Sequence, residues 1–171
     1  MANVDFPRGF IPVRYKDNRA IVNEYFDVAP TNTEIAKYDV VERRADGYVW
    51  PVQAGSTSVV GVAAEAIAAN TGGQIAVVPA PGLVMQAQVD DATVNAQTDI
   101  GLNYDILPTA PVSGKSQMEI DGSTQATTAT LPILIERVSN VISQDGNALG
   151  ANVLVDCVFN QCAYNGGGTG I

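Results

Sequence analysis

The sequence predicts a mainly β protein, with a β-barrel or β-sandwich-like body of short antiparallel strands and an extended N-terminal arm. Short apolar runs recur between turn-forming Gly, Asn, Asp and Pro residues, a spacing typical of sandwiches and barrels. No segment is a convincing helix that would cover a parallel sheet. The 171 residues suit one domain, which we divide into an arm at 1–34, a body at 35–164 and a flexible glycine-rich tail at 165–171.

The first 34 residues are predicted to be extended, because prolines interrupt them and each proline disfavours helix in the residue before it. Aromatic residues and arginines alternate loosely along this arm, and both types are enriched at the energetic centres of protein interfaces. We therefore expect the arm to bind a partner. The same side chains would equally suit the protein's own core, and the sequence does not decide between these uses. The candidate interface residues are Phe6, Arg8, Phe10, Arg14, Tyr15, Tyr25 and Phe26.

The signals for strands begin at Glu34. Residues 34–52 (EIAKYDVVERRADGYVWPV) predict a strand, a turn at 45–47 and a second strand in which Tyr48 and Trp50 alternate with other residues. Asp-Gly between apolar runs is a strong short-range hairpin signal. The following QAGSTS is predicted to be a loop.

Residues 58–78 (SVVGVAAEAIAANTGGQIAVV) have two incompatible interpretations. A strand, a helix and a second strand would indicate a nucleotide-binding crossover unit, but that unit needs roughly 10–12 residues between its strands and three spaced glycines for phosphate. The alanine-rich segment 63–70 is shorter, and VVGVAAEA supplies a single glycine. We therefore favour two strands around the turn at 70–73, with room for one helical turn at the alanines.

The remaining elements continue the β pattern. Leu83, Met85, Ala87 and Val89 alternate with polar residues and predict a strand. A turn-rich stretch at 90–107 and a polar connector at 108–117 precede a short strand, MEI, which ends at Asp121-Gly122. STQATTAT is predicted to be a loop, and LPILIERV and ANVLVDCVF are predicted strands around the turn-forming SQDGNALG.

The charge is distributed unevenly. Residues 1–44 hold seven basic and seven acidic residues, whereas residues 45–171 hold Lys115 and Arg137 against eleven acidic residues and so carry the whole net charge of −9. An acidic body repels phosphate, so we expect no nucleic-acid partner. No apolar run is long enough to span a bilayer and the N-terminus lacks a signal-peptide pattern, so we expect neither a membrane association nor export.

Catalytic side chains are scarce. The chain has no His, which removes the commonest general base and metal ligand, and its Ser and Thr residues have only three Lys as activating partners. Asp90, Asp91 and Asp99 lie near one another in sequence but lack the spacing of a calcium loop, so solvated turn residues are the favoured interpretation. We expect no enzyme activity, no metal and no cofactor.

The two cysteines lie in CVFNQC. If that segment is a strand, Cys157 and Cys162 differ by an odd number and face opposite sides of it. We expect both to be reduced, partly buried small hydrophobic residues of a protein made in the cytosol.

Several motifs together resemble one protein family. The opening MANVDFPRGFIPVR is similar to the start of many small structural proteins of tailed bacteriophages, and SVVGVAAEAIAAN resembles a Val-Gly-Val-Ala segment of their β core. QVDDATVNAQTDIGLNYDI, GKSQMEIDGSTQATTATLPILIERV and DGNALGANVLVDCVFNQCAY resemble their later portion. The order and spacing of these motifs over residues 1–164 carry the resemblance. Gln161-Cys162 departs from the pattern, since a His is common there.

The resemblance implies a capsid decoration (cement) protein, with the function of a virion structural protein. Such a protein is made in the host cytoplasm and binds the outer surface of the phage head, often as a homotrimer, where it holds neighbouring subunits of the major capsid protein together and stabilises the expanded capsid. We expect deletion of residues 1–20 to abolish capsid binding and to leave the body folded. The alternative is a glycan- or receptor-binding β domain on the virion surface, for which Trp50 is the best aromatic platform.

Overall fold

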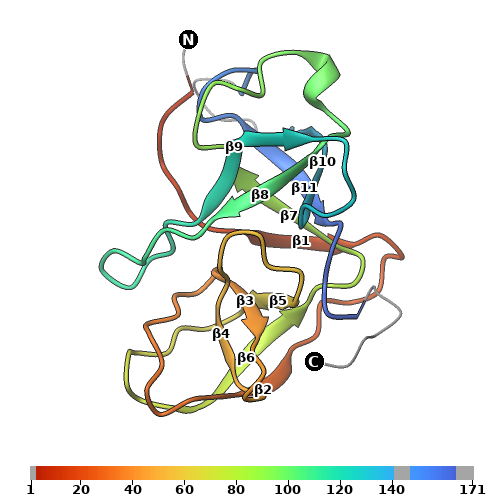
Figure 1. Cartoon of the computed structure of the whole chain (residues 1–171). Coiled ribbons are helices and arrows are strands. Elements are labelled where there is room, and N and C mark those ends of the chain that lie inside the picture. Colours follow the sequence, from red (N-terminus) through yellow and green to blue (C-terminus); the bar gives the residue numbers. More distant parts are fainter. Residues whose placement is uncertain (1–2, 141–146, 165–171) are drawn as a thin grey trace.

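The protein consists of a six-stranded sheet stacked on a closed five-stranded barrel (Figure 1). The computed structural model describes residues 3–140 and 147–164. It confirms the mainly β fold and the barrel; the tail at 165–171 and the first half of the predicted SQDGNALG turn lie outside the described residues. The sheet has the order β1 (Ile11–Tyr15), β7 (Leu83–Gln88), β11 (Leu154–Phe159), β10 (Ile133–Val138), β8 (Asn103–Leu107) and β9 (Glu119–Ala126). The barrel has the order β2 (Glu24–Val28), β4 (Val49–Pro51), β3 (Val40–Arg43), β5 (Val59–Ala63) and β6 (Gly73–Pro79).

Two predicted hairpins form the barrel wall. β3 and β4 pair antiparallel around the Asp-Gly turn, which the Gly47 N–H closes by donating to the Arg44 carbonyl at 2.9 Å. β5 and β6 also pair antiparallel, with Val62 opposite Val78. Residues 58–78 are therefore a hairpin, and the alanine-rich segment between its strands contains no helix. The parallel crossover interpretation is excluded.

The barrel strands direct side chains to two separate cores, and in β5 a register shift at Val60, opposite Val41 and Glu42, interrupts the strict alternation of faces. In β5, Val60 and Ala63 belong to the cluster inside the barrel, whereas Val59 and Val62 belong to the larger cluster shared with the six-stranded sheet. Both faces of β5 are therefore covered, and all five of its residues are buried. A strand covered on both faces loses the polar positions of a half-exposed strand, which explains the uninterrupted sequence VVGVA.

The six-stranded sheet packs one face onto the barrel. Leu83, Met85 and Ala87 of β7 lie in the shared core at alternate positions, as the sequence pattern predicts. β9 continues to Ala126, so the predicted threonine-rich loop is wrong over its first four residues. Its partner β8 falls within the stretch predicted to be turn-rich, which otherwise holds the short 3-10 helix η1 (Gln97–Asp99).

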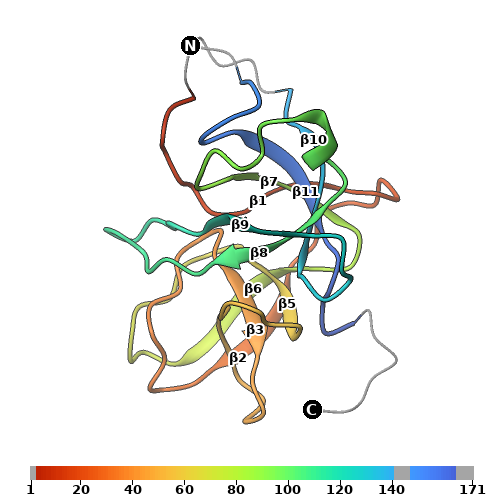
Figure 2. The same cartoon turned by 45° about the horizontal axis from the view of Figure 1, so that its top comes forward.

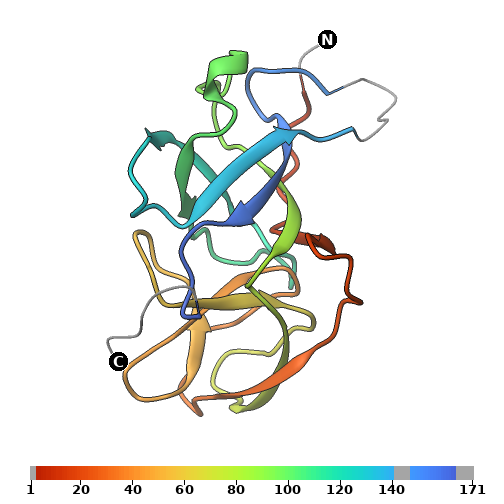
Figure 3. The same cartoon turned by 90° about the vertical axis from the view of Figure 1, so that its right-hand side faces the viewer.

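Residues 3–28, which we call the strap, run along the body from the sheet to the barrel (Figure 3). Gln88 holds the first part of the strap, since its amide donates to the Val4 carbonyl at 2.9 Å and accepts from the Phe6 N–H at 3.0 Å. The strap then supplies β1 to the edge of the sheet and β2 to the barrel, where β2 pairs with β6 and, in parallel, with β4. One segment thus joins the two layers.

The cysteines are reduced and buried, as the sequence predicts, but they do not lie on opposite faces of one strand. β11 ends at Phe159, so the strand geometry that would separate the two thiols does not reach Cys162. The Asn160 N–H donates to the Pro132 carbonyl at 2.7 Å as the chain turns, and Cys162 packs into the same apolar cluster as Cys157. Both cysteines are free and buried, and burial raises the pKa of the Cys157 thiol, which makes it a poor nucleophile.

Candidate interaction surface

The seven predicted interface residues divide into two groups. Phe10, Tyr15 and Phe26 are buried in the protein's own cores. The side chains that remain at the surface are those of Phe6, Arg8, Arg14 and Tyr25. The sequence left open whether the aromatic residues serve a partner or the core, and the structure places three of the seven residues in the core and four at the surface.

Strand geometry explains the division. Tyr25 and Phe26 are neighbours in β2, and successive side chains of a strand point to opposite faces. Phe26 enters the barrel, where the Arg43 guanidinium lies 5.2 Å from its ring centroid, whereas Tyr25 points outward and is 67% exposed. Tyr15 turns inward at the end of β1 and its hydroxyl donates to the Pro79 carbonyl at 3.0 Å.

Exposed apolar side chains concentrate in the strap. Of the nine large hydrophobic residues exposed among the described residues, six belong to it, and we call these six the strap surface. They are Val4, Phe6, Val13, Ile21, Val22 and Tyr25. The strap makes up 26 of the described residues, so this share is far beyond an even distribution, and concentrated exposed apolar area is typical of contact surfaces. Sequence reasoning missed the aliphatic members because it considered only aromatic residues and arginines.

The edge of the sheet at β1 is poorly suited to adding another strand. Pro12 lacks an N–H, and the register shifts between Pro12 and Arg14, so that Val13 forms a bulge. A proline, a bulge and an exposed Arg14 are features that block pairing between sheet edges. Any partner at this edge is therefore contacted through side chains.

A shallow pocket of about 170 Å³ lies between residues 15–24 of the strap and the β6–β7 connection. The Arg19 guanidinium stacks 3.9 Å from the Tyr15 ring centroid and donates to the Pro81 carbonyl at 2.7 Å, which fixes one wall. Val22 and Tyr164 complete the apolar lining. The pocket gives the strap surface a concave region beside its exposed side chains.

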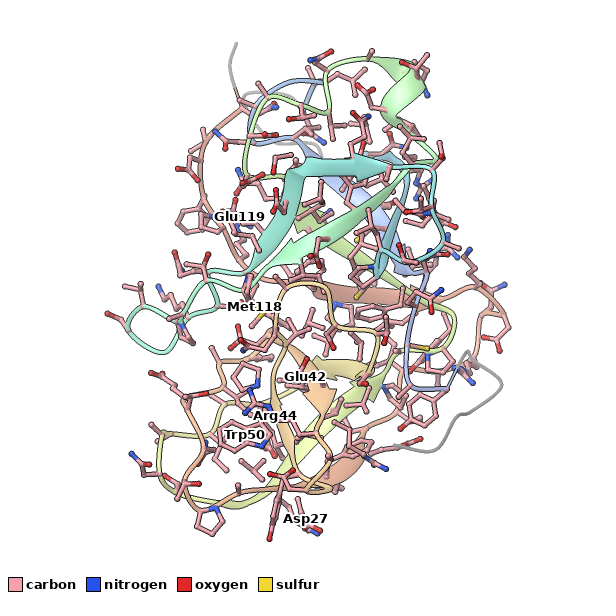
Figure 4. All side chains as sticks on the ribbon, in the orientation of Figure 1. Asp27, Glu42, Arg44, Trp50, Met118 and Glu119 are labelled. Carbon is pink, nitrogen blue, oxygen red and sulfur yellow. The ribbon has the colours of Figure 1, made fainter. Side chains whose placement is uncertain are left out.

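Trp50, the platform considered for a glycan, is partly covered. The Arg44 guanidinium lies 4.3 Å from its ring centroid, and Arg44 also pairs with Glu42 at 3.4 Å (Figure 4). The indole Nε1 is buried and has no hydrogen-bond partner among the described residues. One ring face is therefore already occupied by a cation.

Asp90, Asp91 and Asp99, the aspartates considered for a metal site, all accept hydrogen bonds from the protein itself. Asp91 accepts from the Thr93 N–H and hydroxyl, and Asp99 accepts from the Ala96 N–H at 2.7 Å and the Gln125 amide at 2.8 Å. Asp90 accepts from the Gly122 N–H at 2.9 Å. Within the described ranges, no group of three or more His, Cys, Asp or Glu residues is placed to hold a metal ion.

Two carboxylates beneath the surface have raised pKa values. Asp39 is fully buried at the start of β3, where its Oδ2 accepts from the Ala36 N–H at 2.8 Å, and burial raises its pKa to about 6. Burial also raises the pKa of Glu119, to about 7, and the neighbouring charges of Asp5 and Asp90 add to this effect. In the folded protein both carboxyl groups therefore stay protonated to a higher pH than in the unfolded chain.

We expect the protein to be more stable at pH 5.5 than at pH 8. A carboxyl whose pKa is raised on folding stabilises the fold fully below its unfolded pKa, and this contribution is lost as the pH rises through the folded value. The window runs from pH 3.8 to about 6 for Asp39 and from pH 4.5 to about 7 for Glu119. Between pH 5.5 and pH 8 the loss due to Asp39 is on the order of 1 kcal/mol, because part of its contribution is already lost below pH 5.5. Denaturant unfolding at the two pH values measures it.

Asp39→Asn should reduce this pH dependence, since the amide keeps an acceptor for the Ala36 N–H and cannot ionise. Asp27→Asn, at an exposed position of β2, is the matched control and should leave the difference unchanged. Equal stability of the wild type at both pH values would contradict the assignment.

The described residues contain no helix that is long and apolar enough to cross a bilayer. No protein-family model, curated protein or solved structure matches the chain.

Proposed function

We propose that this protein is a capsid decoration protein that binds the outside of a phage head and cements neighbouring major capsid protein subunits, so stabilising the expanded shell. The observation that carries the proposal is the strap surface. Its exposed apolar side chains gather on the segment that contains most of MANVDFPRGFIPVR, one of the motifs that resemble phage decoration proteins. On this proposal the functional form is a homotrimer.

The way in which the strap is held suits a mechanical role. Its backbone is fixed at both layers by β1 and β2, so the exposed side chains are positioned before a partner arrives. Pre-positioned side chains lose little conformational entropy on binding, which leaves more of the contact energy for affinity. A standard interface buries roughly 1,600 Å². In a trimer, binding at one site raises the effective concentration of the other two sites at the shell, so the three together bind more tightly than one alone.

The acidic body complements this role. Residues 45–171 carry the whole net charge of −9, which favours solubility before assembly. The strap itself contains as many basic as acidic residues at positions 3–28. The neutral segment can therefore approach another protein with less electrostatic repulsion than the body.

Binding to expanded empty heads of the phage that encodes the chain tests the proposal. We expect the wild type to co-sediment with heads and to give density on their outer surface at threefold positions. The variant Val22→Asp/Tyr25→Ser should bind about tenfold or more weakly, because exposed apolar and aromatic anchors contribute most of the energy of an interface.

Tyr48→Ser is the matched control, since Tyr48 is also an exposed tyrosine but lies in the β3–β4 turn, outside the strap. It should bind as the wild type does. Heads that never retain the wild type, or a gene located in a cellular operon and not beside that of a major capsid protein, would reject the proposed function.

A further inference from the structure

A loop between β8 and β9 projects from the body (Figure 2). Residues 108–117, which we call the finger, extend away from both the sheet and the barrel (Figure 2). The sequence suggested only a polar connector here. The finger lies between β8 and β9, and its base returns to the body at Met118, which is buried at the junction of the two layers (Figure 4). The Val40 N–H contacts the Met118 sulfur at 3.3 Å.

The finger is braced in spite of its projection. Val112 and Lys115 exchange two backbone hydrogen bonds, at 3.0 and 3.1 Å, around Ser113 and Gly114. Both central residues have positive φ angles, 53° and 74°, as in the tight type I′ hairpin turn. The backbone of Lys115 also pairs with that of Lys37, near the barrel, in an isolated parallel β-bridge. The finger therefore has a defined shape before it contacts anything.

An apolar groove of about 240 Å³ separates the finger from the barrel. One wall is the first limb of the finger, with Pro108 and Pro111, and the other wall is the end of β4, with Pro51 and Val52. Met118 contributes to the lining between them. This volume is below the ~300–1,000 Å³ of sites for small molecules. It suits a few side chains of an extended peptide.

The charges at the groove select the chemistry of its occupant. The ion pairs formed within the described residues involve neither Lys37 nor Lys115. In residues 45–171 the only other cation, Arg137, is paired with Asp156 at 2.6 Å. Glu34 is the one charged residue in the groove lining. Lys37 and Lys115 lie outside this lining, and the Lys37 ammonium lies 4.9 Å from the Tyr38 ring centroid. Lys115 is thus the one charged residue of the finger, and its backbone pairs with that of Val112, whose side chain is 59% accessible.

We propose that the finger and its groove bind an extended apolar segment of the major capsid protein that carries a carboxylate. The inference rests on the proposed function and adds to it a second attachment point, distinct from the strap surface. Apolar side chains of the segment fill the groove, and its carboxylate pairs with Lys115 at the rim. Because the rest of the body is acidic, this local attraction also orients the protein on the shell.

The test uses the full chain and expanded empty heads. Lys115→Gln and Val112→Asp each lower the net charge by one, and Thr127→Asp, at an exposed position of the β9–β10 connection, is a control with the same change. We expect each finger variant to bind heads about fivefold to tenfold more weakly at low salt, and the control to bind as the wild type does. Unchanged thermal unfolding curves would show that the finger variants are folded.

A photo-cross-linking residue at position 112 identifies the occupant, with the same residue at position 127 as its control. An adduct between position 112 and the major capsid protein supports the inference. An adduct with another copy of this chain, or unchanged affinity of both finger variants, overturns it while wild-type binding still supports the proposed function. Failure of the wild type to bind heads rejects the proposed function itself, and this inference with it.

Discussion

Deletion of residues 1–20 is expected to abolish cooperative unfolding, and not merely the binding of a partner. The deletion removes β1, an edge strand of the six-stranded sheet, and the buried rings of Phe10 and Tyr15. Loss of one buried aromatic side chain typically costs about 3–5 kcal/mol. Two such losses together with a strand are comparable to the whole stability of a domain, about 5–15 kcal/mol. Thermal unfolding followed by circular dichroism measures the outcome.

A shorter deletion is the control, because it removes neither β1 nor the buried rings. Removal of residues 1–5 leaves Phe6 and all of β1 in place and takes away the contact between Val4 and Gln88. This variant should keep a single cooperative transition. A folded, cooperative 1–20 deletion would show that the strap contributes little to the core and would restore the expectation, drawn from sequence alone, of a removable arm.

Gly61→Ala is expected to destabilise the barrel by about 3 kcal/mol or more. Gly61 lies in the middle of β5, opposite Val41 on one side and Pro79 on the other. A Cβ atom at this position would overlap the Val78 carbonyl oxygen and would come within 2.8 Å of a Val77 methyl group. Backbone atoms of a paired strand cannot move aside as a flexible side chain can, and overpacking of a core typically costs 1–3 kcal/mol even where side chains yield. Urea unfolding gives the difference in free energy.

Gly47→Ala provides the comparison. Gly47 has a φ angle of +86° in the β3–β4 turn, but no atom lies within 4 Å of a Cβ built there. Alanine at this position should lower the free energy of unfolding only by the strain of a left-handed backbone conformation, on the order of 1 kcal/mol. Equal effects of the two substitutions would mean that β5 moves to accommodate a side chain at Gly61. The close approach of Gly61 to the Val78 carbonyl would then not limit the barrel.

The hairpins of the barrel could be predicted because their signals are local. Asp46-Gly47 and the Gly72-Gly73 pair supply the backbone conformations of tight turns, and apolar runs flank both. β8 could not be found in this way, because its sequence NYDIL places a carboxylate in a buried strand. The buried Asp105 carboxylate is stabilised there by the Gly55 N–H, which donates a hydrogen bond to it at 2.7 Å from a loop distant in sequence. Long-range hydrogen bonds of this kind leave no periodic pattern.

The candidate surface was only partly predictable for a related reason. The sequence identifies the strap as rich in aromatic residues and arginines, but it does not reveal which side chains face inward. In β2 that choice depends on pairing with β6, about fifty residues later in the chain, which places Phe26 opposite Ile75 and buries both. The bulge at Val13 further breaks the alternation in β1. The finger was missed because a proline-containing polar stretch resembles an ordinary connection.

The attachment of the strap to both layers has a consequence for biosynthesis. Ile11 pairs with Gln86, which is translated 75 positions later (86 minus 11). At roughly 5–20 residues per second, the nascent strap waits about 4–15 s before its partner strand leaves the ribosome. During that interval the aromatic residues that will form the core are available to chaperones or to neighbouring nascent chains. The fold therefore forms late in synthesis, from pairings between distant segments, and we expect its rate to be that of a slow, high-contact-order β protein.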